Sequence, residues 1–376
     1  MAVCVIGGGV VGTAVALAAA RRGVEVVLLE AEPELGLAAS GTNSGILHTG
    51  FDSHPGELET RLILRSAQLR DPVLHALDIP VLRVGATLRP RDATEREAVA
   101  RLADNARANG VDVELQSDGS LFVPGESVTD PVAYTIALGA AAERAGARVT
   151  CGARVTGIAD RGDALELSAE DGQALARADV VVNCAGLFAD EVARAAGDDR
   201  FSIYPRKGEF FVFDPPDPAL LERVRLPVPS AGTKGVLVFP TVDGKLVAGP
   251  TAHDQDDKHD WSVRPEARDE VLGKAQSLVP ELVGAEPIAA YAGLRPAGVG
   301  VNYLIERSPV QPHLVNVAAI RSTGLSASLG IAEHVMGLVR EAGVALGEET
   351  PLRPGPRPQS AAPWWKRSAS YRSGTR

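Results

Sequence analysis

Alternating apolar and polar stretches predict a βαβ unit at the start of the chain. The apolar run "AVCVI" at residues 2–6 has the length of a strand, and the alanine-rich stretch after the "GGG" turn has the length of a helix. A second apolar run, "VEVVLL" at residues 24–29, completes the unit within about 30 residues.

Further apolar runs extend this α/β pattern along the chain. Residues 92–109 and 131–145 are predicted to be helices, residues 147–158 one or two strands, and "ADVVVNCAG" at 178–186 a buried strand. The strand "LVNVAAI" is followed by "RSTGLSASLG", read as a loop that enters a helix at 331–339. Strands that are apolar throughout are typical of a parallel sheet covered on both faces.

The middle of the chain has a different pattern. Short apolar runs such as "GEFFVFD" and "KGVLVFPTVDGKLVAGPTA" are separated by glycine and proline, which is typical of antiparallel strands. We therefore predict an α/β fold with a Rossmann-like nucleotide-binding domain and an inserted, mainly antiparallel β-sheet substrate domain. The first domain takes residues 1–80, 129–200 and 293–350, and the second takes residues 81–128 and 201–292.

Composition narrows the possible partners and location. The 376 residues are enough for two domains, and the net charge of −10 argues against nucleic acid as the main partner. No apolar run reaches the roughly 20 residues of a membrane span, and the first strand begins directly after Met1. A cytoplasmic protein without a transmembrane segment is expected.

Cysteine and histidine positions give no sign of a metal site. Cys4, Cys151 and Cys184 are far apart and lie in apolar or strand-like surroundings, so a disulfide framework is not expected. His253 and His259 lie in the acidic loop "TAHDQDDKHDW", which is read as a solvated loop. We predict no bound metal.

The last segment, residues 351–376, has five prolines, six basic residues and no acidic residue. Such a composition predicts a basic disordered tail. Its charge is opposite to that of the rest of the chain, so contact with the body, an acidic partner or a membrane surface stays open, although the adjacent Trp364 and Trp365 are unusual for a solvated end.

The glycine turn of the first βαβ unit carries a dinucleotide-binding fingerprint. Gly7, Gly9 and Gly12 form GxGxxG between strand and helix, and Glu30 follows at the end of the next strand. The glycines allow a tight turn, close approach of a pyrophosphate and close helix packing, while Glu30 suits a ribose diol and disfavours NADP. The fingerprint alone leaves FAD and NAD open.

Six stretches, taken together, carry a resemblance to a known family: "VIGGGVVGTAVALAAARRGVEVVLLE", "SGTNSGILHTGFDSHPGELETRL", "PRKGEFFVFD", "GVLVFPTVDGKLVAGPTA", "YAGLRPA" and "STGLSASLGIAEHV". Over residues 2–343 the chain resembles FAD-dependent oxidoreductases of the D-amino acid oxidase superfamily. More narrowly, it is similar to the group of L-2-hydroxyglutarate dehydrogenase/oxidase and the large-subunit type of glycerol-3-phosphate dehydrogenase. The resemblance implies FAD as cofactor, with its ring between the two domains.

The resemblance also implies which residues bind FAD. Gly7, Gly9, Gly12 and Glu30 would hold the ADP part, Val155 the adenine side, and Gly324, Leu325 and Ser326 the pyrimidine edge of the ring. The other implied contacts are Ser40, Asn43, Ser44, Gly45, Ala185 and Gly186.

The segment "NSGILHTG" supplies a candidate catalytic residue. Oxidation of a secondary alcohol removes the hydroxyl proton while hydride leaves carbon for flavin N5, and imidazole is suited to accept a proton near neutral pH. His48 aligns with the histidine of the family segment and is the predicted base. A role limited to hydrogen bonding with flavin or substrate remains the alternative.

An acidic protein needs local positive charge to bind an anion. Arg295 and Arg321 are predicted to meet a carboxylate or phosphate, because guanidinium makes bidentate bonds to either. Lys207 is predicted to add to this field, and Tyr291 to donate a hydroxyl to the substrate. Each of them has a structural ion-pairing or packing role as its alternative.

The predicted function is FAD-dependent oxidation of the CH–OH group of a small anionic substrate, a 2-hydroxy acid such as L-2-hydroxyglutarate or glycerol 3-phosphate. Phe51 and Asp52 replace tyrosines that are usual in the hydroxyglutarate enzymes, and Asp52 would disfavour a dianion if it points inward. An amino acid or amine oxidase and a non-catalytic flavoprotein or electron-transfer subunit are the alternatives. The electron acceptor (oxygen, quinone or partner protein) stays open.

Overall fold

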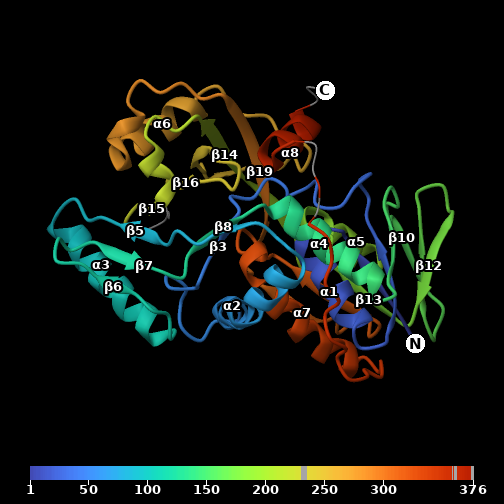
Figure 1. The fold of residues 1–376 in the computed structure, drawn as a ribbon. Helices are drawn as coiled ribbons and strands as arrows, with labels where there is room; N and C mark the ends of the chain where they lie inside the picture. Colours follow the sequence, from blue (N-terminus) through green and yellow to red (C-terminus); the bar gives the residue numbers. More distant parts are fainter. Residues whose placement is uncertain (230–234, 358, 360–361, 374–376) are drawn as a thin grey trace.

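The computed structural model describes residues 1–229, 235–357, 359 and 362–373 and is built around two large sheets (Figure 1). The first sheet has the order β20-β21-β13-β1-β2-β9, in which only the edge strand β20 is antiparallel. Its strands are β1 (Ala2–Ile6), β2 (Glu25–Leu29), β9 (Arg148–Thr150), β13 (Val180–Asn183), β20 (Leu304–Arg307) and β21 (Leu314–Ala318).

Alternating side chains of these buried strands pack on two different layers. Val3 and Val5 of β1 face a helical layer, whereas Cys4 and Ile6 face a second layer of antiparallel strands. The helical layer consists of α1 (Val10–Ala20), α2 (Leu58–Ala76), α4 (Pro131–Arg144) and α7 (Gly324–Glu341); the other layer consists of β10 (Gly157–Asp160), β11 (Leu165–Ser168) and β12 (Ala174–Ala178), with α5 (Ala189–Ala195) beside them. The predicted covered sheet is thereby confirmed.

The second sheet is mostly antiparallel and has nine strands in the part of the chain that the structure describes. Its longest pair is β14 (Ile203–Phe213) with β19 (Ala289–Gly298), antiparallel over ten residue pairs. The other strands are β5 (Ala86–Leu88), β6 (Glu114–Leu115), β7 (Leu121–Val123), β15 (Val224–Leu226), β16 (Leu237–Pro240), β17 (Leu246–Gly249) and β18 (His253–Asp254). Phe211 and Phe213 pack against α6 (Ala267–Leu278), while Phe210 and Val212 share a core cluster with residues of α3 (Ala93–Ala108).

A small sheet lies between these two parts (Figure 1) and consists of β3 (Ile46–Leu47), β8 (Ser127–Thr129) and β4 (Val81–Leu82). Short 3-10 helices cover Gly186–Phe188, Pro218–Glu222 and Pro280–Leu282. Among the described residues, no helix combines the length and the apolar character that crossing a membrane requires. The same residues include no group of three or more metal-ligating side chains arranged to hold an ion.

One predicted element boundary differs from the structure. The glycine- and serine-rich stretch predicted as a loop is itself helical, since α7 begins at Gly324 and not near residue 331. Its small residues pack closely: a Cβ on Gly330 would lie 2.2 Å from the carbonyl oxygen of Leu62 in α2. Residue 293, one of the predicted domain limits, lies inside β19. The domain limits stay predictions.

The prediction of a disordered tail is wrong for its described helical part. Residues 364–373 form α8 (Trp364–Ser373), and Trp364 and Trp365 are buried in the same core cluster as Tyr291 and Phe210. Burial of the two indole rings stabilises α8, although the basic composition of the segment predicted disorder. The tail prediction for residues 358, 360–361 and 374–376 lies outside the described residues.

Candidate active site and cofactor cavity

The glycine turn after β1 forms one end of a cavity. Gly7 has φ +106°, and a Cβ on this residue would lie 2.3 Å from the carbonyl oxygen of Cys184, which follows the neighbouring strand β13. A Cβ on Gly12 would lie 1.9 Å from the carbonyl oxygen of Gly7. At Gly9 the nearest atom is the Ser40 hydroxyl at 3.1 Å, so the backbone at the start of α1 stays accessible. The turn therefore has the shape that a pyrophosphate requires.

The carboxylate of Glu30 is fixed at the end of β2. It accepts hydrogen bonds from the backbone N–H of Gly8 and, at 2.8 Å, from that of Glu32. Burial raises the pKa of Glu30, and these two hydrogen bonds oppose the rise. Glu30 also lines the cavity, as expected for a residue that meets a ribose diol.

This cofactor cavity has a volume of about 190 Å³ and runs along the carboxyl ends of the central strands of the first sheet. Ligands of doubly covered α/β sheets bind at this edge. Of the predicted FAD contacts, those that line it are Gly7, Gly9, Gly12, Glu30, Ser40, Asn43, Val155, Ala185, Gly186, Gly324 and Leu325.

Three predicted FAD contacts lie elsewhere. Ser44 lines the second cavity, described below. Gly45 has φ +77° and packs against β8, where a Cβ would lie 2.4 Å from the carbonyl oxygen of Thr129. Ser326 is buried in α7, and its hydroxyl accepts a hydrogen bond from the backbone N–H of His48 at 2.9 Å. Gly45 and Ser326 thus hold the His48 segment in place without lining either cavity.

A second cavity, of about 360 Å³, adjoins the first. Ala39, Asn43, Arg321 and Ser322 line both of them. His48, Asp52 and Arg295 also line the second cavity. So does Arg206, an arginine that was not predicted from the sequence. We call it the substrate cavity.

His48 is held by a buried carboxylate that the sequence analysis missed. Its Nδ1 lies 2.9 Å from Oε2 of Glu126, whose side chain is 0% exposed. The other carboxylate oxygen of Glu126 accepts hydrogen bonds from the backbone N–H and the hydroxyl of Thr49, at 2.7 and 2.9 Å. Assigning the Nδ1 proton to this contact leaves Nε2 of His48 as the nitrogen available to a substrate.

Arg206 and Arg295 lie directly opposite each other on β14 and β19, so both guanidinium groups reach the substrate cavity from one face of the sheet. Arg295 donates to three backbone carbonyls, those of Arg206, Lys207 and Thr251, at 3.2 to 3.4 Å. Burial, with the nearby charge of Arg206, lowers the pKa of Arg295 to about 10. Arg206 also pairs with Asp254, with Nη1 to Oδ1 at 3.5 Å, but on Arg295 the effect of Arg206 exceeds that of Asp254. An anion in this cavity would therefore meet two closely placed guanidinium groups.

Two glycines make room for this arrangement. A Cβ on Gly208 would lie 2.4 Å from Nη2 of Arg295, and a Cβ on the opposing Gly293 would lie 2.8 Å from the carbonyl oxygen of Thr42. Their lack of side chains lets Arg295 cross the strand and lets the segment around Thr42 approach the sheet. Glycine inside a strand is a known sign of close approach, and this signal in "KGEF" and "YAGL" could have been used.

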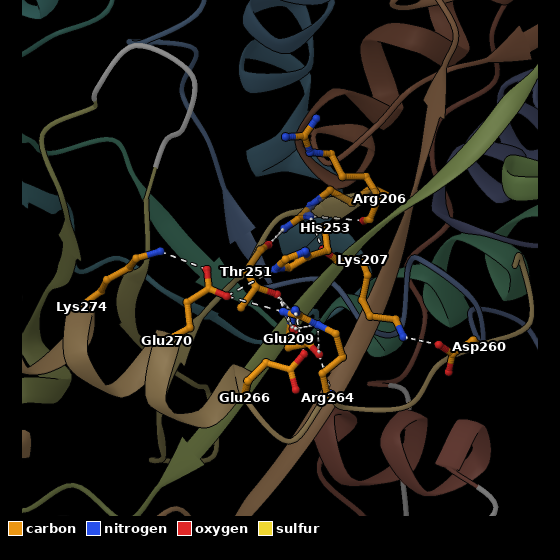
Figure 2. A network of polar contacts seen from close by, with 11 residues as sticks. Arg206, Lys207, Glu209, Thr251, His253, Asp260, Arg264, Glu266, Glu270 and Lys274 are labelled. Carbon is orange, nitrogen blue, oxygen red and sulfur yellow. Dashed lines mark hydrogen bonds and ion pairs between the residues drawn. The ribbon is translucent and has the colours of Figure 1, made fainter. Parts of the chain in front are cut away.

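A polar network next to the cavity stabilises this corner of the sheet (Figure 2). The buried carboxylate of Glu209 accepts from Arg264, with Nη2 to Oε2 at 2.6 Å, and from the hydroxyl of Thr251 at 2.7 Å. Thr251 in turn offers its carbonyl to Arg295. The network therefore positions Arg295 through the backbone of Thr251.

Lys207 does not reach the substrate cavity. Side chains alternate along β14, so Lys207 points to the face opposite to Arg206 and pairs with Asp260 at 2.7 Å, as Figure 2 shows. This contact lowers the pKa of Asp260 to about 2. The structure thus corrects the predicted placement of Lys207 beside a substrate.

Tyr291 is on the cavity face of β19 but four residues before Arg295, and it is buried in the core. Its ring stacks on Phe210 at 4.8 Å and meets Trp364 at 5.5 Å. Phe210, its opposite neighbour on β14, lines the substrate cavity, whereas Tyr291 does not. The predicted hydroxyl donor is therefore a core residue beside Phe210 and does not line the substrate cavity.

Arg321 lies where the two cavities meet. It has φ +53°, an uncommon conformation for a residue other than glycine, and its backbone N–H donates to the Pro296 carbonyl at 3.2 Å. Such backbone strain persists where the surrounding structure enforces it. Held in this conformation, Arg321 lines both cavities.

Comparison with known proteins agrees with this geometry. The family model described as FAD dependent oxidoreductase matches residues 2–338. The chain belongs to this family of FAD-dependent oxidoreductases. The family resemblance seen in the sequence is thereby confirmed, and FAD is its cofactor. The glycine turn, Glu30 and the accessible start of α1 fit the ADP part of that cofactor.

Relatives within the family differ in the substrates named for them. A glycerol 3-phosphate dehydrogenase of Caloramator mitchellensis is 29% identical over 90% of this chain and 73% of the relative. An L-2-hydroxyglutarate dehydrogenase of Escherichia coli is 26% identical over 66% of this chain and 63% of the relative. The solved structure of L-α-glycerophosphate oxidase from Mycoplasma pneumoniae, 24% identical, has a TM-score of 0.87 over 96% of this chain and 100% of that chain, which confirms the fold.

Proposed function

We propose that this FAD-dependent enzyme oxidises the CH–OH group of a small anionic substrate and that this substrate is glycerol 3-phosphate. The observation that carries the proposal is the substrate cavity, where His48 and three arginines converge beside the cofactor cavity. Bound FAD would take up the hydride that the substrate carbon loses.

His48 is the proposed base. With Nδ1–H donated to Glu126, the lone pair on Nε2 is free to accept the proton of the substrate hydroxyl. Glu126 acts through His48 as a positioning residue. Hydrogen bonds from Thr49 to the second carboxylate oxygen of Glu126 hold this carboxylate in its orientation towards His48. A buried carboxylate also stabilises the imidazolium that forms when His48 takes the proton.

Arg206, Arg295 and Arg321 are proposed to bind the anionic end of the substrate. Guanidinium groups make paired hydrogen bonds to phosphate and carboxylate oxygens. Arg295 is held by backbone carbonyls, so its positive charge is not offset by a carboxylate within those contacts. Binding of a dianion there would offset the repulsion between Arg206 and Arg295.

Asp52 supports the choice of glycerol 3-phosphate as the substrate. Its side chain lines the substrate cavity together with His48. A carboxylate there accepts hydrogen bonds from hydroxyl groups, which glycerol 3-phosphate has at the end away from its phosphate. The longer match to the Caloramator relative supports the same choice.

The test is an anaerobic screen for bleaching of the bound flavin. Purified holoenzyme is mixed with glycerol 3-phosphate, L-2-hydroxyglutarate, or a panel of amino acids, and the visible flavin absorbance is followed. Rapid bleaching by glycerol 3-phosphate alone is the expected result. Bleaching by amino acids with release of ammonia would replace the proposal with an amino acid oxidase, and no bleaching by any compound would support a non-catalytic flavoprotein.

A further inference from the structure

The chain after α7 follows the helical layer before it forms α8 (Figure 1). Gly347 and Thr350 donate backbone hydrogen bonds to the carbonyls of Arg22 and Arg21, at 2.9 and 2.8 Å. Gly355 donates to the carbonyl of Ala76 at the end of α2, at 3.1 Å. These contacts lead the chain across the ends of α1 and α2 towards the cofactor cavity.

One side of α8 is anchored on the second sheet. Trp364 is fully buried and meets the ring of Tyr291 edge-on at 5.5 Å. Trp365 donates its indole N–H to Asp243, in the turn between β16 and β17, at 3.1 Å. A helix held by two buried tryptophans is fixed to the substrate-cavity part of the molecule.

The other end of α8 contacts the segment that follows β2. Arg367 pairs with Glu34, and the hydroxyl of Tyr371 donates to Glu32. Arg372 donates from Nη2 to Glu32 at 3.2 Å and from Nε to the carbonyl of Leu37 at 3.0 Å. The helix thus connects the second sheet with the acidic segment beside Glu30.

Arg372 is also part of the cofactor cavity. Its guanidinium lies 4.5 Å from the ring centre of Trp261, and both side chains line the cavity. Glu30 and Glu32 place two carboxylates at the same cavity, where a diphosphate would add further negative charge. A fixed guanidinium at this place offsets that repulsion and can bind phosphate oxygens.

We propose that α8 closes the cofactor cavity and that Arg372 is an FAD-binding residue whose charge retains the diphosphate. Release of FAD then requires Arg372 to leave Glu32, Leu37 and Trp261. The C-terminal segment is in this view a part of the cofactor site contributed by the far end of the chain. The inference depends only on FAD binding, so it can be tested whatever the substrate is.

The experiment compares full-length holoenzymes of the wild type, Arg372→Ala, Arg372→Lys and Lys366→Ala. Lys366 is exposed on the same helix and serves as the matched control. FAD release after dilution is followed by flavin fluorescence, and melting temperatures are measured for each apoprotein. Loss of a charge-assisted contact in Arg372→Ala should accelerate release at least about tenfold, with a smaller change in Arg372→Lys.

The apoprotein measurement separates binding from folding. Arg372→Ala removes the contacts of Arg372 with Glu32 and Leu37, so its apoprotein melts below that of Lys366→Ala. Under the proposal, FAD release from Arg372→Ala accelerates by more than this loss of apoprotein stability accounts for, and release from Lys366→Ala does not accelerate. FAD release from Arg372→Ala at the wild-type rate would overturn the proposal. Faster release with an equal loss of apoprotein stability would also overturn it, since Arg372 would then be only a structural contact.

Discussion

The two cavities are built by opposite means. The cofactor cavity depends on positions where a side chain is missing, as at Gly7 and Gly12, where a Cβ would collide with backbone atoms. The substrate cavity depends on side chains brought from distant segments, such as His48 and Arg295. An added side-chain atom should therefore impair the cofactor cavity most. Removal of a functional group should impair the substrate cavity most.

The largest expected effect is at Gly12. A Cβ in Gly12→Ala would lie 1.9 Å from the Gly7 carbonyl oxygen, so α1 must shift away from the glycine turn. We expect the purified variant to lack FAD, as measured by visible absorbance. Gly337→Ala is the control, because this exposed glycine of α7 has nothing within 4 Å of the added Cβ. Full FAD content in Gly12→Ala would contradict the close-packing account.

His48→Asn should have the next largest effect, in the substrate cavity alone. Loss of a general base lowers rates by about 10²–10⁴-fold. The rate constant of anaerobic flavin reduction, measured by stopped flow, should fall by this factor while the FAD content stays at the wild-type level. An unchanged reduction rate would leave His48 with a hydrogen-bonding role only.

Glu126→Gln should have a smaller effect on the same step. The neutral amide keeps the size of the side chain but removes the charge that faces Nδ1 of His48. Flavin reduction should slow by about 10–100-fold with little change in KM, since Glu126 acts on the base and not on substrate binding. Glu126→Asp should recover part of the rate. A change confined to KM would argue against a positioning role.

Gly208→Ala should separate anion binding from the chemical step. The added Cβ would lie 2.4 Å from Nη2 of Arg295 and would displace this guanidinium. KM for glycerol 3-phosphate should rise about tenfold, the value of one charge-assisted contact, with FAD retained. Gly273→Ala in α6, with nothing within 4 Å, is the control. Equal KM values in the two variants would reject this role of Gly208.

The smallest effect is a pH dependence of substrate binding. Arg295 has a pKa lowered to about 10, so it is charged below this pH and loses its proton as the pH rises through it. KM for an anionic substrate should therefore rise above about pH 10 in wild type. Arg295→Gln should have a high KM that lacks this rise, and a parallel rise in both proteins would assign it to another group.

The same contrast between the cavities explains what the sequence could predict. The cofactor cavity follows from contiguous motifs, so spacing alone predicted Gly7, Gly9, Gly12 and Glu30, all of which line it. The substrate cavity is assembled by strand pairing, which spacing does not reveal. Once Arg206 and Arg295 are known to be opposite each other, alternation along β14 explains why Lys207 points away.

Two other residues could not be predicted from the sequence, for different reasons. Glu126 carries no local motif, and its contact with His48 arises because β3 and β8 pair. Arg372 lies in a basic, proline-rich tail whose composition predicts disorder, yet two buried tryptophans fix the helix that carries it. Contacts between residues far apart in the sequence place the side chains of both Glu126 and Arg372.

The opposite positions of Arg206 and Arg295 on β14 and β19 also affect the choice of storage and assay buffers. Like charges directly opposite on neighbouring strands destabilise a sheet. Any oxyanion that binds between the two arginines therefore adds its binding free energy to the stability of the fold. Sulfate or phosphate buffers should raise the melting temperature by about a few degrees over chloride at equal ionic strength. The same buffers would compete with the substrate, so conditions that preserve this enzyme best in storage would also inhibit it in an assay.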